Sequence, residues 1–139
     1  MSSEFFAPKP KDNEPWDTIV LGSGPAGLTS AIYTTRGAAS TLIIAGDAWG
    51  GQLMLTTDVD DFPGFPEGIQ GPDLMAYMRK QAEYHGAEII ETDFVSGDFS
   101  PPAGALFSVT AGEKTYQGKS IIIATGADTK WLGVKGEQE

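Results

Sequence analysis

The clearest chemical signal in the sequence is the run GSGPAG, with glycines at positions 22, 24 and 27. It fits the pattern GxGxxG, in which Gly22 makes a tight turn, Gly24 lets the backbone approach a pyrophosphate and Gly27 lets helix and strand pack closely. The N-terminus of the following helix then favours the phosphate charge. A phosphate loop of the GxxxxGK[ST] type is excluded, because Leu28 stands where lysine is required. The run predicts a dinucleotide site.

The segments around this turn indicate a strand, a helix and a second strand. Residues 17–22 and 41–46 are short apolar runs typical of strands buried on both faces. Residues 28–37 between them predict a helix that Gly37 ends as a C-cap. Such a unit has parallel strands joined by a right-handed crossover. The expected apolar face of the helix consists of Ala26, Leu28, Ala31 and Ile32.

The middle of the chain predicts a loop followed by a second helix. Residues 61–73 are rich in proline and glycine, which favours a rigid irregular loop. Residues 74–86 have helical periodicity, with Asp73 as the expected N-cap and Gly86 as the end. The residues expected to face the core are Leu74, Met75, Met78 and Ala82.

The last part of the chain predicts further strands. Residues 87–90 indicate a third strand, residues 106–110 and 114–118 a hairpin, and residues 120–127 a buried strand that returns to the parallel sheet. A small antiparallel meander is expected over residues 95–117. The fold class predicted is α/β: a three-layer, Rossmann-like FAD/NAD(P)-binding domain with a parallel sheet and a β-meander.

Composition limits the classes of function. A chain of 139 residues with a net charge of −10 is long enough for one domain and lacks the basic surface that nucleic acid requires. It has no cysteine, so it forms no disulfide, thiolate metal site or dithiol redox centre. No signal peptide or membrane-spanning run stands out, so we expect a cytoplasmic protein that does not bind membranes. Residues 1–15 are expected to be a disordered leader, and residues 16–139 the domain.

Several acidic residues and the single histidine are weaker candidates. A dinucleotide site usually has an acidic residue for the ribose near the end of the second strand, but Ala45 stands there. Asp47, two residues later, is either that ribose ligand or a surface turn residue. Asp58, Asp60 and Asp61 lack histidine or cysteine partners, so no metal site is expected. His85 is expected to cap a helix, and no catalytic residue is predicted.

The order of five short motifs adds a family resemblance. They are GSGPAG, GGQL at residues 50–53, FPGFP, GPDLM and ATGA. In this order they resemble the first FAD-domain segment of the low-molecular-weight thioredoxin reductases, and the resemblance covers residues 16–137. The family commonly carries asparagine where this chain has Asp61, so an amide that donates and accepts is replaced by a carboxylate that only accepts.

The resemblance implies a set of residues that bind FAD. Residues 23–26 are implied to hold the pyrophosphate. Those implied to lie along the flavin are Gly46, Gly51 and Gln52, with Thr57 and Asp61 nearby. The backbone of Phe94 is implied to meet the adenine, and the turn at residues 124–126 to pass close to the cofactor. The full expected set is Gly22, Ser23, Gly24, Pro25, Ala26, Gly27, Gly46, Gly51, Gln52, Thr57, Asp61, Phe94, Thr125 and Gly126.

The resemblance also implies a reaction and partners. In that family electrons pass from NADPH through FAD to a disulfide and then to thioredoxin, and the full-length enzyme is a homodimer. The NADPH-binding domain with its Cys-x-x-Cys is absent from this chain, so the domain is expected to be an incomplete first segment. Two alternatives remain: a ferredoxin-NADP reductase of the same architecture, and a module that binds FAD or NAD(H) without turnover.

Overall fold

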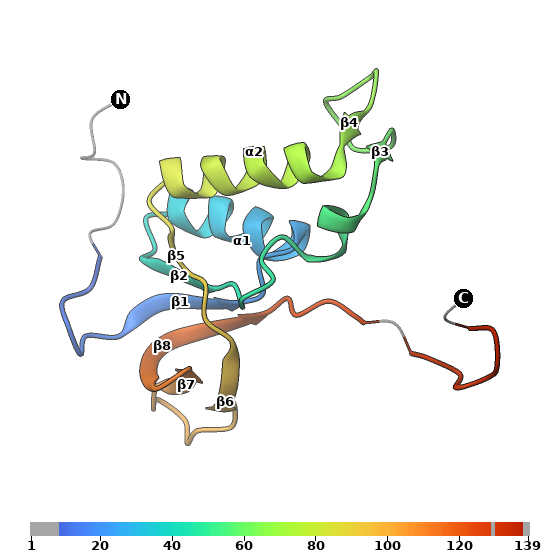
Figure 1. The fold of residues 1–139 in the computed structure, drawn as a ribbon. Coiled ribbons are helices and arrows are strands. Elements are labelled where there is room, and N and C mark those ends of the chain that lie inside the picture. The colour runs from blue at the N-terminus through green and yellow to red at the C-terminus, as the bar shows by residue number, and fades with distance from the viewer. Residues whose placement is uncertain (1–8, 129, 138–139) are drawn as a thin grey trace.

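The computed structural model describes residues 9–128 and 130–137, and it contains the predicted strand, helix, strand unit (Figure 1). The unit consists of β1 (Trp16–Leu21), α1 (Pro25–Arg36) and β2 (Thr41–Ile44). The two strands pair in parallel, and Val20 lies opposite Ile43. Proline starts α1, where its missing N–H costs nothing, and Gly37 is the C-cap as predicted.

The strands form one six-stranded sheet with the order β5-β2-β1-β8-β7-β6. Its other members are β5 (Glu88–Ile90), β6 (Phe94–Asp98), β7 (Phe107–Ala111) and β8 (Lys114–Ile123). β5, β2, β1 and β8 pair in parallel, whereas β8, β7 and β6 form the predicted antiparallel meander.

β8 is one strand of ten residues, although the sequence predicted two separate strands in this region. Its first half pairs with β7 as far as Gly118, and from Gly118 onward it pairs with β1. Figure 1 shows the strand passing from the meander into the parallel sheet. The apparent break in the sequence pattern therefore marks the point where the pairing partner of β8 changes from β7 to β1. The polar first half of the strand lies in the meander, and the apolar second half lies in the parallel sheet.

Apolar side chains fill both faces of the parallel sheet and give the predicted three layers. On one face Val20 and Ile43 pack under α1 and α2 (Gly71–Tyr84), the two helices that cover the same side of the sheet in Figure 1. On the other face Ile19 and Leu42 pack with Val109 of the meander. Burying each such side chain contributes roughly 1.5–3 kcal/mol.

α2 confirms the predicted core and corrects the predicted boundaries. The helix begins at Gly71 and not at residue 74, with Gln70 as its N-cap. Asp73 is therefore a first-turn residue, where its charge suits the positive end of the helix dipole, and not the N-cap. The helix ends at Tyr84, and His85 is its C-cap. The predicted core residues Leu74, Met75, Met78 and Ala82 are all buried.

The loop expected over residues 61–73 is shorter than predicted. β3 (Asp58–Val59) and β4 (Ile69–Gln70) pair as a two-stranded antiparallel ladder at its base. Pro63, Gly64, Pro66 and Gly68 lie between these strands, where no ladder hydrogen bond is needed, so they do not prevent the pairing. β4, the second strand of this ladder, is followed directly by α2.

The N-terminal segment is described only from Lys9. Residues 9–15 contain a turn at 12–13 and no helix or strand, and Lys9 forms an ion pair with Glu88. The rest of the expected leader, residues 1–8, lies outside the described residues. Across residues 9–128 and 130–137, neither helix has the length and apolar character needed to cross a membrane.

Candidate functional site

A cleft of about 720 Å³ opens where the carboxyl ends of β1 and β8 meet the N-terminus of α1. Ligands of open α/β sheets bind at this edge of the sheet, so the position suits the predicted dinucleotide site. Nine of the predicted binding residues line it: Gly22, Ser23, Gly24, Pro25, Ala26, Gly51, Gln52, Thr125 and Gly126.

Ser23 fixes the first glycine turn to the loop that follows β2. Its side chain is almost fully buried, and its hydroxyl donates to the carbonyl of Ala45 at 3.1 Å. The same hydroxyl accepts the backbone N–H of Gly50 at 2.9 Å. Because these bonds join segments 22 to 27 residues apart, the wall of the cleft is formed before any ligand arrives.

Gly22 and Gly27 allow the turn to pack as closely as the sequence pattern requires. A Cβ atom on Gly27 would lie 2.0 Å from the carbonyl oxygen of Gly22, and one on Gly22 would lie 2.3 Å from the carbonyl oxygen of Ala124. Gly22 also has a φ of +106°, which side chains disfavour. These two glycines therefore have packing roles, and Gly27 does not line the cleft.

The N-terminus of α1 faces the cleft, and within the described residues its first backbone N–H groups have no hydrogen-bond partner. The first hydrogen bond of the helix runs from the N–H of Leu28 to the carbonyl of Gly24, so the N–H groups of Ala26 and Gly27 precede the ladder. A Cβ atom on Gly24 would meet nothing within 4 Å, which leaves open space in front of this end. Ala26, expected on the apolar face, is exposed here and lines the cleft.

The opposite wall comes from a short 3-10 helix, η2 (Gly51–Leu55), and from the turn after β8. Gln52 joins the two, because its Nε2 donates to the carbonyl of Ala127 at 2.7 Å. Gly51 approaches the glycine turn so closely that a Cβ atom there would lie 3.3 Å from Cα of Gly24. A bound molecule would therefore contact backbone on both sides.

Trp49 is a lining residue that the sequence analysis did not identify. The guanidinium of Arg79 lies 4.6 Å from the centre of its ring and is paired with Glu83 and Glu91. Burial alone would lower the pKa of Arg79, but its hydrogen bonds to the two glutamates raise it. The charged cluster thus holds one side of the indole in place. In the sequence, the position of Trp49 directly before the GGQL motif was the one feature that could have indicated its role in lining the cleft.

The structure does not bring every predicted residue to the cleft. Thr57 accepts a hydrogen bond from the N–H of Gly71 through its carbonyl, and Asp61 lies in the exposed loop after β3. Phe94 begins β6 and packs against Phe99. Gly46 lies beside the cleft and against Asp93. Contacts of these residues with a cofactor stay predictions.

Other lining residues were also missed. Most carry apolar or small side chains with no chemical signature, so only the tertiary structure identifies them. They are Ala45, Ala48, Leu53, Met54, Leu55, Ala127 and Asp128.

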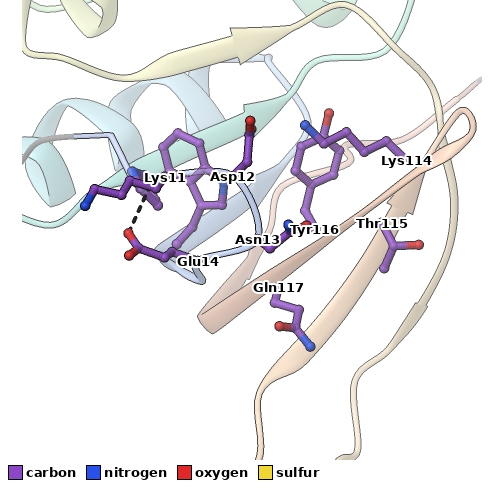
Figure 2. Close-up of a pocket in the computed structure, with 10 residues that line it drawn as sticks. Lys11, Asp12, Asn13, Glu14, Lys114, Thr115, Tyr116 and Gln117 are labelled. Carbon is purple, nitrogen blue, oxygen red and sulfur yellow. Dashed lines mark hydrogen bonds between the residues drawn. The ribbon is translucent and has the colours of Figure 1, made fainter.

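A second pocket of about 240 Å³ lies between residues 10–14 and the start of β8 (Figure 2). Figure 2 shows a bond from the backbone N–H of Lys11 to Glu14, and the ammonium of Lys114 lies 5.0 Å from the centre of the Tyr116 ring. Its lining carries charged side chains of both signs, Lys11, Asp12, Glu14 and Lys114, so it does not favour a ligand of one charge. In the described part of the chain, no group of three histidine, aspartate or glutamate side chains could hold a metal ion.

Comparison with known proteins places this arrangement in a family. The model for pyridine nucleotide-disulphide oxidoreductases matches residues 16–139. The chain belongs to this family. That membership agrees with the glycine turn, the parallel sheet and the position of the cleft.

The most similar relatives include several thioredoxin reductases. The enzyme of Rickettsia prowazekii is 50% identical over 121 residues, which is 87% of this chain and 38% of the relative. The bifunctional thioredoxin reductase/thioredoxin of Mycobacterium leprae is 44% identical over 123 residues, 88% of this chain and 26% of the relative. The chain thus spans well under half the length of these relatives.

Solved structures show the same likeness. Thioredoxin reductase from Giardia duodenalis superposes with a TM-score of 0.79 at 37% identity, over 91% of this chain and 40% of that one. The enzyme from Lactococcus lactis gives a TM-score of 0.79 at 34% identity, over 88% of this chain and 39% of that one. The chain is thioredoxin-reductase-like in sequence and in fold.

Proposed function

We propose that this chain is the FAD-binding part of a thioredoxin-reductase-like flavoprotein that passes electrons from NADPH through FAD to a disulfide. The observation that carries the proposal is the cleft at the N-terminus of α1, with the glycine turn on one wall and the Ala124–Gly126 turn on the other. Family membership supports it, because a relative of 50% identity is a thioredoxin reductase. FAD, when bound, supplies the two-electron carrier between nicotinamide and disulfide.

The residues of the cleft fit a pyrophosphate at the first turn. Among the described residues the N–H of Ala26 has no hydrogen-bond partner. This donor and the dipole of α1 favour an anion, and the bare Cα of Gly24 leaves room for it. Gln52 fixes the opposite wall, and Trp49, Met54 and Leu55 add an apolar lining suited to a flat ring system. The role of these side chains is to bind and orient.

The remaining steps of the proposal need groups that this sequence does not contain. The chain has no cysteine, so a redox-active dithiol must come from elsewhere in the protein. NADPH, thioredoxin and a second subunit are proposed partners on the strength of the relatives, and a cytoplasmic location is proposed with them. The alternative, a module that binds the cofactor without turnover, differs only in lacking these partners.

We further propose that residues 16–139 form a first segment whose sheet a further strand completes. Residues 119–123 of β8 pair with β1 on one side, and among the described residues no strand pairs with their other side. Ile123 at the end of this stretch is 63% exposed. An open edge with an exposed apolar side chain suits an additional strand.

Binding of FAD to the purified chain tests the proposal. Free ligand is removed after mixing, the flavin absorption spectrum is recorded, and quenching of flavin fluorescence gives the dissociation constant, with NADPH as a control. We expect FAD to bind and NADPH not to bind. If FAD leaves with the free ligand at every concentration, the proposed function of this chain is wrong.

A variant of the glycine turn locates the bound cofactor. Gly24→Val places bulk in the open space before α1, so we expect FAD binding to weaken at least about tenfold while the fold persists. Ala103→Val adds similar bulk in an exposed loop and should bind FAD like the original chain. Equal affinity of the two variants would place the cofactor elsewhere.

A further inference from the structure

The end of β2 lacks the carboxylate that dinucleotide sites use for a ribose. Ala45 follows β2, is buried and is succeeded by Gly46. A carboxylate near this point accepts hydrogen bonds from the ribose hydroxyls in related folds. Asp47 is near in sequence, but within the described residues its side chain makes no hydrogen bond that would hold it in place.

Asp93 reaches the same place from the segment that follows β5, the strand beside β2. β5 pairs in parallel with β2, and the N–H of Ala45 donates to the carbonyl of Ile90 at 2.9 Å. The chain therefore leaves both strands at one edge of the sheet. Oδ1 of Asp93 accepts the backbone N–H of Asp47 at 3.0 Å, and a Cβ atom on Gly46 would lie 3.0 Å from the same oxygen. The carboxylate thus lies against the bare Cα of Gly46.

Asp93 is held in position and still has acceptor capacity. Its carbonyl accepts the N–H of Gly112 at 3.1 Å, which anchors its backbone to the meander. Its side chain is exposed, and across residues 9–128 and 130–137 its Oδ2 has no hydrogen-bond partner. An ionised carboxylate has about four acceptor sites, so a second oxygen can accept from hydroxyl groups.

We propose that Asp93 supplies, from the segment after β5, the carboxylate that accepts the ribose hydroxyls of the adenosine half of the cofactor. This inference rests on the proposed function, since it assigns a residue to the binding of FAD. It also explains the glycine at position 46, because a side chain there would press against the carboxylate. The ligand chemistry is a vicinal diol next to an adenine base.

The test compares three aspartate variants that remove the same charge. Asp93→Asn keeps an oxygen that can accept the N–H of Asp47, so the loop is preserved while the anionic acceptor is lost. Asp98→Asn, on the following strand β6, is the matched control, and Asp47→Asn tests the competing residue. We expect Asp93→Asn to weaken FAD binding about tenfold and the other two less than about twofold.

Ligands that lack one group separate a ribose contact from a general loss of structure. FMN has no adenosine half, so its affinity should not change in Asp93→Asn. In competition with FAD, the original chain should prefer ADP over 2′-deoxy-ADP or 3′-deoxy-ADP by several-fold, and Asp93→Asn should lose at least one of these preferences. The 2′-deoxy and 3′-deoxy ligands also show which hydroxyl is bound.

The outcomes distinguish this inference from the proposed function. If the original chain binds FAD and Asp93→Asn binds it equally well, the inference is wrong and the proposed function stands. Loss of affinity in Asp47→Asn alone would transfer the role to Asp47, and equal weakening of FMN would show a purely structural role for Asp93. If the original chain binds neither FAD nor ADP, both proposals are overturned.

Discussion

The two turns that line the cleft are held in different ways. The turn after β1 has a buried serine with two hydrogen bonds, and its glycines pack against backbone at distances that exclude a side chain. The turn after β8 is anchored by the N–H of Ala124, which donates to the carbonyl of Leu21 at 2.8 Å. Beyond that bond Thr125 and Gly126 are exposed, and a Cβ atom on Gly126 would meet nothing within 4 Å.

The contrast indicates that the turn after β1 is ordered by contacts within this chain, whereas the turn after β8 needs further contacts. The first turn lies between β1, β2 and α1, whose apolar side chains are buried on both faces of the sheet. The second turn leads to residues 131–134, where Trp131, Leu132 and Val134 are exposed. Apolar side chains without neighbours contribute little to stability. We therefore expect substitutions near the first turn to affect folding far more than those near the second.

The largest effect is expected from truncating a leucine in each region. Leu28 in α1 is fully buried, so Leu28→Ala should lower the free energy of unfolding by about 2–5 kcal/mol. Leu132 is 81% exposed, and Leu132→Ala should change it by less than about 0.5 kcal/mol. Urea unfolding followed by circular dichroism measures both. Similar losses would mean that the second region packs more tightly than the structure shows.

Alanine in place of a glycine should give the next largest effect. Gly27→Ala puts Cβ 2.0 Å from a carbonyl oxygen, and we expect a loss of about 3 kcal/mol. Gly126→Ala meets no atoms but imposes a φ of +71° on alanine, which costs about 1 kcal/mol. Gly24→Ala, with φ at −68° and open space, should leave stability within about 0.5 kcal/mol. Midpoints of urea unfolding rank the three variants.

Removing one hydroxyl from each turn isolates the role of Ser23. Ser23→Ala leaves the carbonyl of Ala45 and the N–H of Gly50 without their partner, which should cost about 2 kcal/mol. Thr125→Ala removes an exposed hydroxyl and should cost less than about 0.5 kcal/mol. Hydrogen exchange at Gly50 should accelerate in the serine variant only. Unchanged exchange there would contradict the preformed wall of the cleft.

The smallest effect concerns the attachment of β8 to β1 far from both turns. Hydrogen bonds from Lys119 and then Ser40 lower the pKa of Asp17 from 3.8 to about 2. Because the folded pKa is below the unfolded value, the stabilisation is present above pH 4 and is lost as the pH falls towards 2. Asp17 is partly exposed, so screening limits the effect to less than about 1 kcal/mol.

Acid titration of stability checks this expectation. The difference in unfolding free energy between the original chain and Asp17→Asn should shrink between pH 4 and pH 2. A difference that stays constant over this range would contradict the pKa assigned to Asp17.

Local patterns were enough to predict the βαβ unit, the core face of α2 and the glycine turn. Each depends on residues close in sequence: the spacing of Gly22 and Gly27, the period of Leu74 and Met78, and the cap at Gly37. The start of α2 and the pairing of β3 with β4 were missed. Both depend on whether the segment rich in proline pairs with another strand, and residues close in sequence do not determine such pairing.

The residues predicted to hold a pyrophosphate could be named from the sequence, because the glycine turn and the helix after it are one continuous segment. Which distant loops lie beside them depends on the order of the strands in the sheet. The sheet order places β8 beside β1 and β5 beside β2, and so brings Gln52 to Ala127 and Asp93 to Gly46. The physical reason is that strand order follows from burying both faces of the sheet, a property of the whole chain.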